Sequence, residues 1–308
     1  MHAHAAYDTY YYDGVYTYAP GAPYFDFART RWWTGDAMVS PHLGRRHKLE
    51  AGGEVRVVTR RAQYSSEHDV GFGALSDPRV WGVFVQDEIT VFPRLTFVAG
   101  VRYDDLGSAQ SKTSPRVALV FKPRQSTALK LLASDAFRAP NAFEQGYWRI
   151  QPLLPKLHPE KIDAVEIVAE HYTGNGLRLS FSMYRHFIDD LISQTADAAG
   201  NLGYINGSDI LSHGLSVEVE KRFQSGWYLR GAWSAQRSLN PATQLVISNS
   251  PAHVAKFAVN IPLFHRRADL GITDRAASHV LNVRRVPVPG QNQTDITLST
   301  AKPWRKTE

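Results

Sequence analysis

Apolar and polar residues alternate one by one along much of this chain. From Val80 to Glu144 the sequence forms four alternating segments joined by short connections. In the segment from Leu95 to Asp104, every second residue is apolar or aromatic, while Thr96, Gly100 and Arg102 belong to a smaller, more polar face. A period of two predicts β-strands whose two faces meet different environments. Residues 177–184 and 215–220 show the same alternation, with Arg, Ser and Glu on the polar side.

Short and long connections also alternate between these segments. VFPR, FKPRQS, YTGNG, RFQSG and PLFHRR are short, and the connections that separate them, such as DDLGSAQSKTS and LISQTADAAGNLGYINGSDILSH, are longer. In an antiparallel sheet this order places the short turns at one end and the long loops at the other, as in outer-membrane β-barrels. The pattern predicts about fourteen strands, mostly of about 10 to 13 residues. A soluble β-sandwich has a similar alternation, so periodicity alone leaves both architectures open.

The N-terminal region is less regular. We expect a short aromatic strand from Ala6 to Tyr12, then an irregular connection rich in Tyr, Gly and Pro that reaches Thr30. The next strand contains Trp32 and Trp33, which suit a membrane interface. The first residues lack the apolar core of a secretory signal, and we expect His2 and His4 to lie in a flexible terminus rather than in a metal site.

Composition removes several classes of function. The chain has no Cys, no run of about 20 apolar residues, and no HExxH, GxSxG, GxGxxG or GxxxxGK[ST] motif, so we expect neither a membrane helix nor an enzyme, and no metal site or cofactor. The net charge is +6, but the basic residues are scattered over turns and strand ends. This distribution argues against a nucleic-acid partner.

A set of fragments, in order along the chain, resembles the barrel of TonB-dependent outer-membrane receptors. They are GVFVQDEITVFPRLTFVAGVRYD, SPRVALVFKP, LKLLASDAFRAPNAFE, LHPEKIDAVEIVAEH, FIDDLI, YINGSDILSHGLSVEVEKRF and NSPAHVAKFAVNIPL. The resemblance is best over residues 80–300, and YYYDG and the Trp pair extend it toward the N-terminus. It implies an all-β, antiparallel transmembrane β-barrel in the outer membrane of a Gram-negative bacterium, in contact with outer-membrane lipid.

The resemblance also sets expectations about what is missing. The family's barrels have about 22 strands, a plug domain and a segment that engages TonB. No plug is recognisable in residues 1–308, which resemble a partial barrel domain of about fourteen strands, truncated at both ends. TonB would therefore act only through a plug that this chain lacks. Unpaired strand edges are costly in lipid, so we expect that the chain alone does not form the family's closed pore.

The family imports scarce ligands such as ferric siderophores, haem or cobalamin, which implies a small chelate or macrocycle as the ligand here. Aromatic faces pack well against such molecules, and arginine suits an anionic chelate. An aromatic girdle at the membrane surface explains the N-terminal tyrosines equally well, and a structural ion pair between Arg138 and Glu144 is favoured over a ligand contact. The candidate ligand-binding residues in the expected extracellular loops are Tyr12, Tyr16, Tyr18, Tyr24, Arg138, Tyr147, Trp148 and Arg149.

The sequence thus predicts an outer-membrane receptor or transporter barrel for TonB-energised uptake, as a fragment that is not competent alone. Two alternatives remain open at this point. One is a small passive outer-membrane pore, and the other is a soluble all-β binding module whose long loops form the site.

Overall fold

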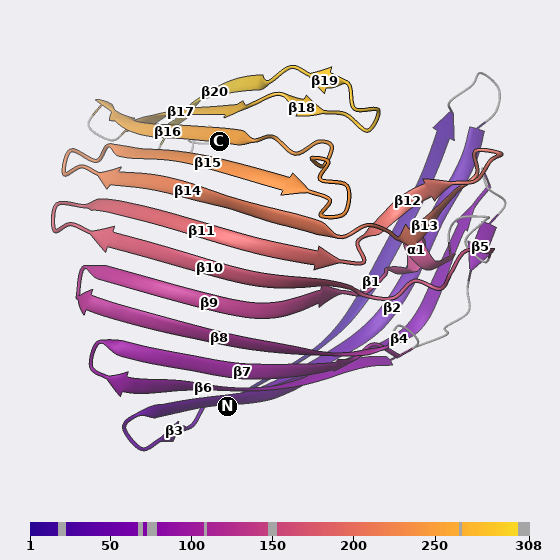
Figure 1. The fold of residues 1–308 in the computed structure, drawn as a ribbon, viewed down its shortest axis with the longest axis horizontal. Coiled ribbons are helices and arrows are strands. Elements are labelled where there is room, and N and C mark those ends of the chain that lie inside the picture. The colour runs from indigo at the N-terminus through magenta and orange to yellow at the C-terminus, as the bar shows by residue number, and fades with distance from the viewer. Residues whose placement is uncertain are drawn as a thin grey trace, which may run out of the picture.

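One long antiparallel sheet dominates the structure (Figure 1). The computed structural model describes residues 1–17, 23–66, 70–72, 79–107, 110–146, 153–264 and 267–300. Fourteen strands follow one another in the sheet in the order β1-β2-β4-β6-β7-β8-β9-β10-β11-β14-β15-β16-β17-β20, and the short strands β3 and β5 add to β4. All the pairings are antiparallel, so the predicted all-β antiparallel architecture is confirmed.

The strands of this path are mostly 10 to 14 residues long, and those near the N-terminus are longer. Their bounds are β1 His2–Thr17, β2 Pro23–Val39, β4 His47–Ser65, β6 Arg79–Phe92, β7 Leu95–Asp105, β8 Ser111–Arg124, β9 Thr127–Arg138, β10 Glu160–Tyr172, β11 Leu177–Asp189, β14 Ile210–Arg222, β15 Tyr228–Leu239, β16 His253–Leu263, β17 Ala268–Ala277 and β20 Gln291–Thr300. The strands curve together into a trough (Figure 1), and in the described residues no pairing joins β1 to β20.

The short turns lie together at one end of the sheet (Figure 1), as the alternating connection lengths predict. The turn between β10 and β11 shows why its sequence is TGNG. Gly176 has a φ of +79°, a conformation that favours glycine, and a Cβ there would lie 2.6 Å from the carbonyl oxygen of Arg222 on β14. This glycine therefore lets the turn pack closely against the neighbouring strand.

The long connections at the other end contain small elements of their own. They are β5 Val70–Phe72, the helix α1 Ala142–Gly146, and the hairpins β12 Ile192–Ala196 with β13 Leu202–Asn206 and β18 Val280–Leu281 with β19 Pro287–Val288. At the opposite end, the turn between β2 and β4 contains the short strand β3 His42–Leu43. Regular backbone pairing within these loops satisfies polar groups that an irregular loop would leave to water.

The prediction of an irregular connection near the N-terminus, up to Thr30, is wrong. β1 continues to Thr17 and β2 begins at Pro23, so most of the stretch between Tyr12 and Thr30 is paired strand, and the first histidines also belong to β1. The aromatic residues explain the difference, because Tyr16 and Tyr24 pair directly across the two strands and their rings stack with centroids 5.1 Å apart. Cross-strand aromatic pairs stabilise a sheet despite the nearby glycine and proline residues.

The sheet has almost no buried apolar core among the described residues. The buried apolar side chains lie mainly near the long-loop ends of the strands, and they are Leu157, Pro159, Ile192, Ile210, Leu239 and Ala268. Many large apolar side chains along the sheet are instead more than a third exposed, for example Leu131 at 48% and Val165 at 49%. A water-soluble sandwich would bury such side chains between two sheets, so this structure is inconsistent with the soluble alternative.

Candidate ligand-binding face

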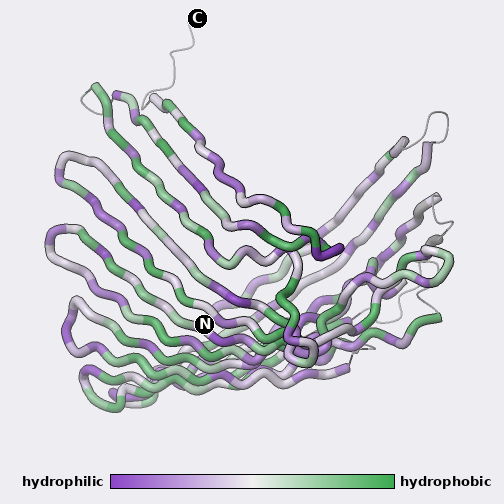
Figure 2. Tube along the Cα trace, turned by 45° about the horizontal axis from the view of Figure 1, so that its top comes forward, coloured by the Kyte–Doolittle hydropathy of each residue, from purple (hydrophilic) through white to green (hydrophobic). Residues whose placement is uncertain are grey.

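The two faces of the sheet differ in chemistry. Residues that pair directly across neighbouring strands lie on the same face, so rows of paired residues identify each face. One such row is entirely apolar and crosses seven strands: Ile89, Phe97, Leu119, Leu131, Ile167, Met183 and Leu215. Figure 2 shows the resulting alternation of hydrophobic and hydrophilic positions along the strands. We call the face that carries this row the apolar face and the opposite one the polar face.

Aromatic side chains frame the apolar face at both ends. Toward the long loops, Trp33 is 53% exposed and its ring lies 4.7 Å from that of Tyr7, and the rings of Trp81 and Tyr103 are 5.7 Å apart. Toward the short turns, Phe223 and Trp227 are also exposed. An apolar band between two aromatic girdles is typical of a surface that contacts lipid.

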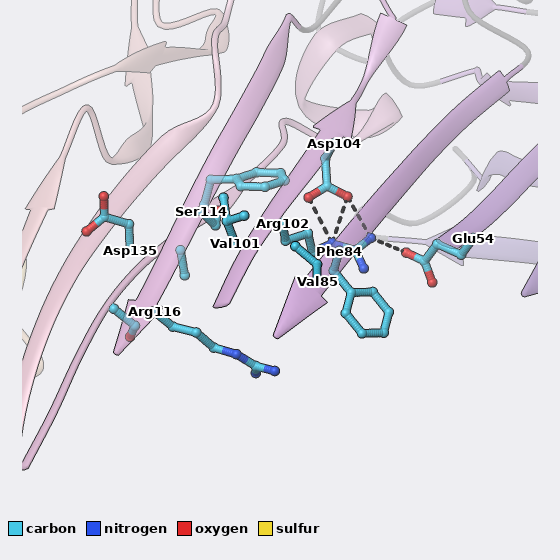
Figure 3. Close-up of a pocket in the computed structure, with 12 residues that line it drawn as sticks. Glu54, Phe84, Val85, Val101, Arg102, Asp104, Ser114, Arg116 and Asp135 are labelled. Carbon is cyan, nitrogen blue, oxygen red and sulfur yellow. Dashed lines mark hydrogen bonds and ion pairs between the residues drawn. The ribbon is translucent and has the colours of Figure 1, made fainter. Parts of the chain in front are cut away.

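The polar face is hollowed in the half of the sheet near the long loops. The hollow measures ≈ 750 Å³ and is lined by residues of β4, β6, β7, β8 and β9, which include charged groups such as Arg116 and apolar ones such as Phe84 and Phe137. Arg102 lies at its centre (Figure 3): Nη2 donates to Oε1 of Glu54 at 2.6 Å and to Oδ1 of Asp104 at 2.6 Å, and Nε donates to Asp104 at 2.9 Å. The carboxylate of Asp104 is 9% exposed, so its charge is balanced mainly by Arg102.

Gly82 makes room for this cluster. Gly82 on β6 pairs directly with Glu54 on β4 and with Asp104 on β7. A side chain at this position would fill the space that Arg102 crosses. A Cβ on Gly82 would lie 2.5 Å from Nη2 of Arg102. The arginine therefore reaches from β7 to β4 only because the intervening strand has no side chain at this position.

A second charged network crosses the polar face near the short turns. Arg178 on β11 donates to Glu170 at 3.1 Å, to Glu218 at 2.7 Å and to Glu220 at 3.0 Å. Lys130 on β9 donates to the other oxygen of Glu170 at 2.6 Å. This network joins β9, β10, β11 and β14 and keeps one face of four strands strongly polar. Such a face is stable when it lines a wet lumen.

The loop after β9 is anchored by Arg138. Its Nε donates to Oε1 of Glu160 on β10 at 2.6 Å, and its Nη1 donates to both oxygens of Glu144 at 3.0 Å. Asn141 caps α1 in a reciprocal arrangement, because its Oδ1 accepts from the backbone N–H of Glu144 at 2.9 Å while Oε2 of Glu144 accepts from the backbone N–H of Asn141 at 2.8 Å. The other oxygen of Glu160 accepts from the backbone N–H of Ile192, which ties β12 to the same anchor.

Among the described residues, no helix is long and apolar enough to cross a membrane. Over the same ranges, no group of three or more His, Asp or Glu side chains is arranged to hold a metal ion. His2 and His4 both lie near the carboxylate of Asp36, at 3.6 and 3.3 Å.

A family model described as TonB dependent receptor-like, beta-barrel, matches residues 2–302. The chain belongs to this family. TonB-dependent receptors are outer-membrane proteins of Gram-negative bacteria, and the chain is accordingly an outer-membrane β-barrel protein. A comparison with curated proteins found no match.

Solved structures share the fold at low sequence identity. The copper transporter OprC superposes with a TM-score of 0.73 at 14% identity, over 97% of this chain and 53% of that one. A ferric enterobactin receptor from Pseudomonas aeruginosa superposes with a TM-score of 0.70 at 15% identity, over 92% of this chain and 49% of the receptor. The siderophore receptor PirA from Acinetobacter baumannii superposes with a TM-score of 0.69 at 14% identity, over 97% of this chain and 53% of the receptor. The chain thus spans about half the length of these receptors.

Within this TonB-dependent receptor barrel, the predicted ligand-binding residues do not form one cluster. Tyr12, Tyr16 and Tyr24 lie in β1 and β2 rather than in a loop; the hydroxyls of Tyr12 and Tyr16 contact each other, and their registers place these three residues on the polar face. Arg138 is held by two carboxylates, which is the structural ion pair that the sequence favoured. The remaining candidates, Tyr18, Tyr147, Trp148 and Arg149, lie outside the described residues.

The N-terminal tyrosines, for which a girdle was the alternative explanation, divide between the two faces. Tyr7 and Tyr11 lie on the apolar face beside Trp33 and Arg29, whose guanidinium carbon is 5.5 Å from the centre of the Tyr11 ring. Of the two tryptophans assigned to the interface, Trp33 faces this side, whereas Trp32 pairs with Asp8 on the opposite face.

The sequence pattern did not predict a site at the cluster of Arg102, Asp104 and Glu54. The alternation already placed Arg102 and Asp104 on the polar side of their strand, but the third member, Glu54, lies 48 residues away from the arginine. Glycine in an otherwise regular strand, as at Gly82, is the signal that was available, because it often marks a close approach by another group.

Proposed function

We propose that this chain supplies part of the wall of a TonB-dependent uptake receptor, with the polar face lining the passage and the long loops at the cell exterior. The observation that supports this most directly is the Arg102 hollow, which places three charged groups on the polar face in the half of the sheet near the long loops. The solved structures named above include receptors for ferric enterobactin and another siderophore, and a copper transporter.

The ligand that we propose is a small anionic metal chelate or a macrocycle, namely a ferric siderophore, haem or cobalamin. Arg116 offers an exposed guanidinium group to an anionic chelate, and Arg102 would bind the chelate in exchange for the exposed carboxylate of Glu54. Tyr12, Tyr16 and Tyr24 offer aromatic surface on the same face. Arg138 at the end of β9, and Tyr18, Tyr147, Trp148 and Arg149 outside the described ranges, remain proposed contacts.

We further propose that residues 1–308 form one partial barrel domain that requires additional strands. Two features support this: the chain spans about half of the related receptors, and the strand path has edges at β1 and β20 with no pairing between them in the described ranges. Unpaired backbone groups at such edges cost several kcal/mol each in lipid. Coupling to TonB then depends on a plug domain from outside this chain.

Two measurements test this proposal. The chain is reconstituted in phosphatidylcholine vesicles and its conductance is recorded. A partial barrel gives no reproducible conductance step, whereas a uniform, stable step establishes the passive-pore alternative and refutes the partial-barrel account.

Binding of ferric enterobactin, haem and cobalamin to the chain in detergent micelles is followed by tryptophan fluorescence. Binding of one of them that weakens in Arg102→Gln supports the proposed passage, and no binding of any of the three refutes it for these ligands.

A further inference from the structure

Three basic residues form a row on the apolar face. Arg185 on β11 pairs directly with His213 on β14, and His213 pairs directly with Arg237 on β15. Strands β11, β14 and β15 are neighbours in the sheet (Figure 1). All three side chains are exposed, and the structure gives none of them a hydrogen bond or an ion pair. We call these three residues the basic row.

The surroundings of the basic row are apolar. Along the strands, Met183 and Leu215 precede it on the side of the short turns, and Phe187 and Leu211 follow it on the other side. A groove of ≈ 320 Å³ runs beside it and is lined in part by Met183, Leu215, His213, Arg237 and His253. Arg237 and His213 bring the basic row into the lining of this groove.

Within the described ranges, no carboxylate forms an ion pair with Arg185, His213 or Arg237. The cross-strand partner of Arg185 on β10 is Val165, and the acidic residue two positions away, Asp163, is already bound by Lys161 with Nζ 2.7 Å from Oδ1. Like charges directly opposite one another destabilise a sheet. An arginine on the lipid face of a barrel costs about 2 to 4 kcal/mol at the bilayer midplane and about 0 to 1 near the interface.

The position of the basic row along the strands indicates what compensates these costs. Arg185 is four residues from the end of β11, His213 three residues from the start of β14, and Arg237 two residues from the end of β15, all at the long-loop end. The row therefore lies toward one membrane interface, where lipid headgroups begin. Guanidinium groups bind phosphate bidentately, and two of them flank the row.

We propose that the basic row binds the phosphate groups of an anionic lipid headgroup in the leaflet next to the long loops, with the acyl chains lying along the apolar residues below it. The phosphates supply the negative charge that the sheet lacks at this point, and the groove accommodates the adjoining part of the lipid. The inference rests on the membrane placement of the apolar face and does not depend on which ligand the receptor imports.

The test compares binding of the full chain, in neutral detergent micelles, to vesicles of phosphatidylcholine alone, phosphatidylcholine with lipid A, and phosphatidylcholine with dephosphorylated lipid A. Phosphorylated lipid A should bind best, and the double variant Arg185→Gln/Arg237→Gln should bind it about thirtyfold more weakly, since each arginine near an anionic lipid surface contributes about fivefold. Free inorganic phosphate should not compete at equal phosphate concentration if a membrane lipid is the source.

The matched control is Lys256→Gln/Arg275→Gln. These two residues pair directly on β16 and β17, next to β15 but on the polar face, so the control removes the same charge from the side away from lipid. Equal loss of lipid A binding in both double variants would overturn the proposal, as would equal binding of the wild-type chain to phosphorylated and dephosphorylated lipid A. The comparison of phosphorylated with dephosphorylated lipid A uses only the wild-type chain, so it tests the proposal even if a substitution prevents folding.

The result of the lipid-binding test can be distinguished from the result of the ligand-binding test of the proposed function. Arg185→Lys/Arg237→Lys keeps the charge and should retain most of the binding to lipid A. Binding of ferric enterobactin, haem or cobalamin through the polar face should be the same in the glutamine double variant as in the wild type, because the basic row lies on the opposite side of the sheet.

Discussion

Gly82 and Arg102 occupy neighbouring strands so closely that a Cβ on the glycine would lie 2.5 Å from Nη2 of the arginine. The arginine crosses above the glycine to reach Glu54, while also holding the buried carboxylate of Asp104. The polar lining of the hollow thus depends on a residue that contributes no side chain.

Replacing Gly82 with valine should displace Arg102 and leave the carboxylate of Asp104 without its cation. We expect the free energy of unfolding to fall by about 1 to 3 kcal/mol, the cost of leaving a buried polar group unsatisfied. Urea titration of the protein in phosphatidylcholine vesicles measures this change. Gly231→Ala is the control, because a Cβ there meets no atom within 4 Å. Similar losses for both variants would mean that the crowding at Gly82 has no specific effect.

The assignment of the two faces predicts that the same substitution has a large effect at one residue and a small effect at its neighbour. Leu131 belongs to the apolar row and is 48% exposed, whereas Leu132 pairs with Glu166 on the polar face. Leu131→Arg should destabilise the membrane-inserted protein by about 2 to 4 kcal/mol, because it places a charge against lipid near mid-strand.

Leu132→Arg should cost much less, since its guanidinium group lies beside Glu166 on the wet side. The ratio of folded to unfolded protein after reconstitution, read from heat-modifiable migration on gels, measures both variants. If Leu132→Arg were the more damaging of the two, the faces would have to be exchanged.

Arg178 on β11 is shared by one carboxylate on β10 and two on β14, so its loss should weaken the packing of these three strands. Arg178→Ala leaves Glu170, Glu218 and Glu220 with less positive charge, and we expect a loss of about 1.5 to 3 kcal/mol, the range for hydrogen bonds to charged groups. Arg178→Lys should recover part of it, because an ammonium group cannot reproduce the planar fork.

The control for Arg178 is Arg116→Ala on the same face, where the arginine is exposed and the structure gives it no partner. Added salt should reduce the difference between wild type and Arg178→Ala, since ion pairs near water are screened. A difference that does not change with salt would point to packing of the side chain instead of its charge.

The sequence predicted the parts of this fold that depend on local pattern. The period of two placed Leu179 and Ser180 on opposite faces, and the alternating turn lengths placed TGNG at the short-turn end, because both signals are contained within a few residues. The extent of β1 and β2 was missed because proline and glycine near Tyr18 suggested a loop, while pairing of Tyr16 with Tyr24 carries the strands further.

The site was harder to predict than the fold for a physical reason. Arg102 reaches Glu54 across β6, and Arg185, His213 and Arg237 come into one row, only after the register of several strands is set. Register depends on contacts between distant segments, which no short window of sequence contains. The pair formed by Arg138 and Glu144 was predictable because only six residues separate them.

The hairpin of β12 and β13 should loosen in acid. Oδ1 of Asp197 accepts from the backbone N–H groups of Ala199 and Asn201 at 2.9 Å each, and Oδ2 accepts from the side chain of Asn201. These hydrogen bonds, first those from Asn201, hold the pKa of Asp197 below its ordinary value of 3.8. Because the pKa is lowered in the folded hairpin, its stabilisation is fully present above that ordinary value and is lost as the pH falls through the lower, folded one.

Amide hydrogen exchange at Ala199 and Asn201 measures this effect. Protection in the wild type should decline as the pH falls below 3.8, after correction for the intrinsic exchange rate. Asp197→Asn keeps one acceptor oxygen but has no charge to titrate, so its protection should be lower above that pH and should not change across it. Asp209→Asn is the control, because this half-buried aspartate accepts from the backbone N–H of Asp190, outside the turn. If the variant kept the same pH-dependent protection as the wild type, the carboxylate of Asp197 would not be what orders the turn.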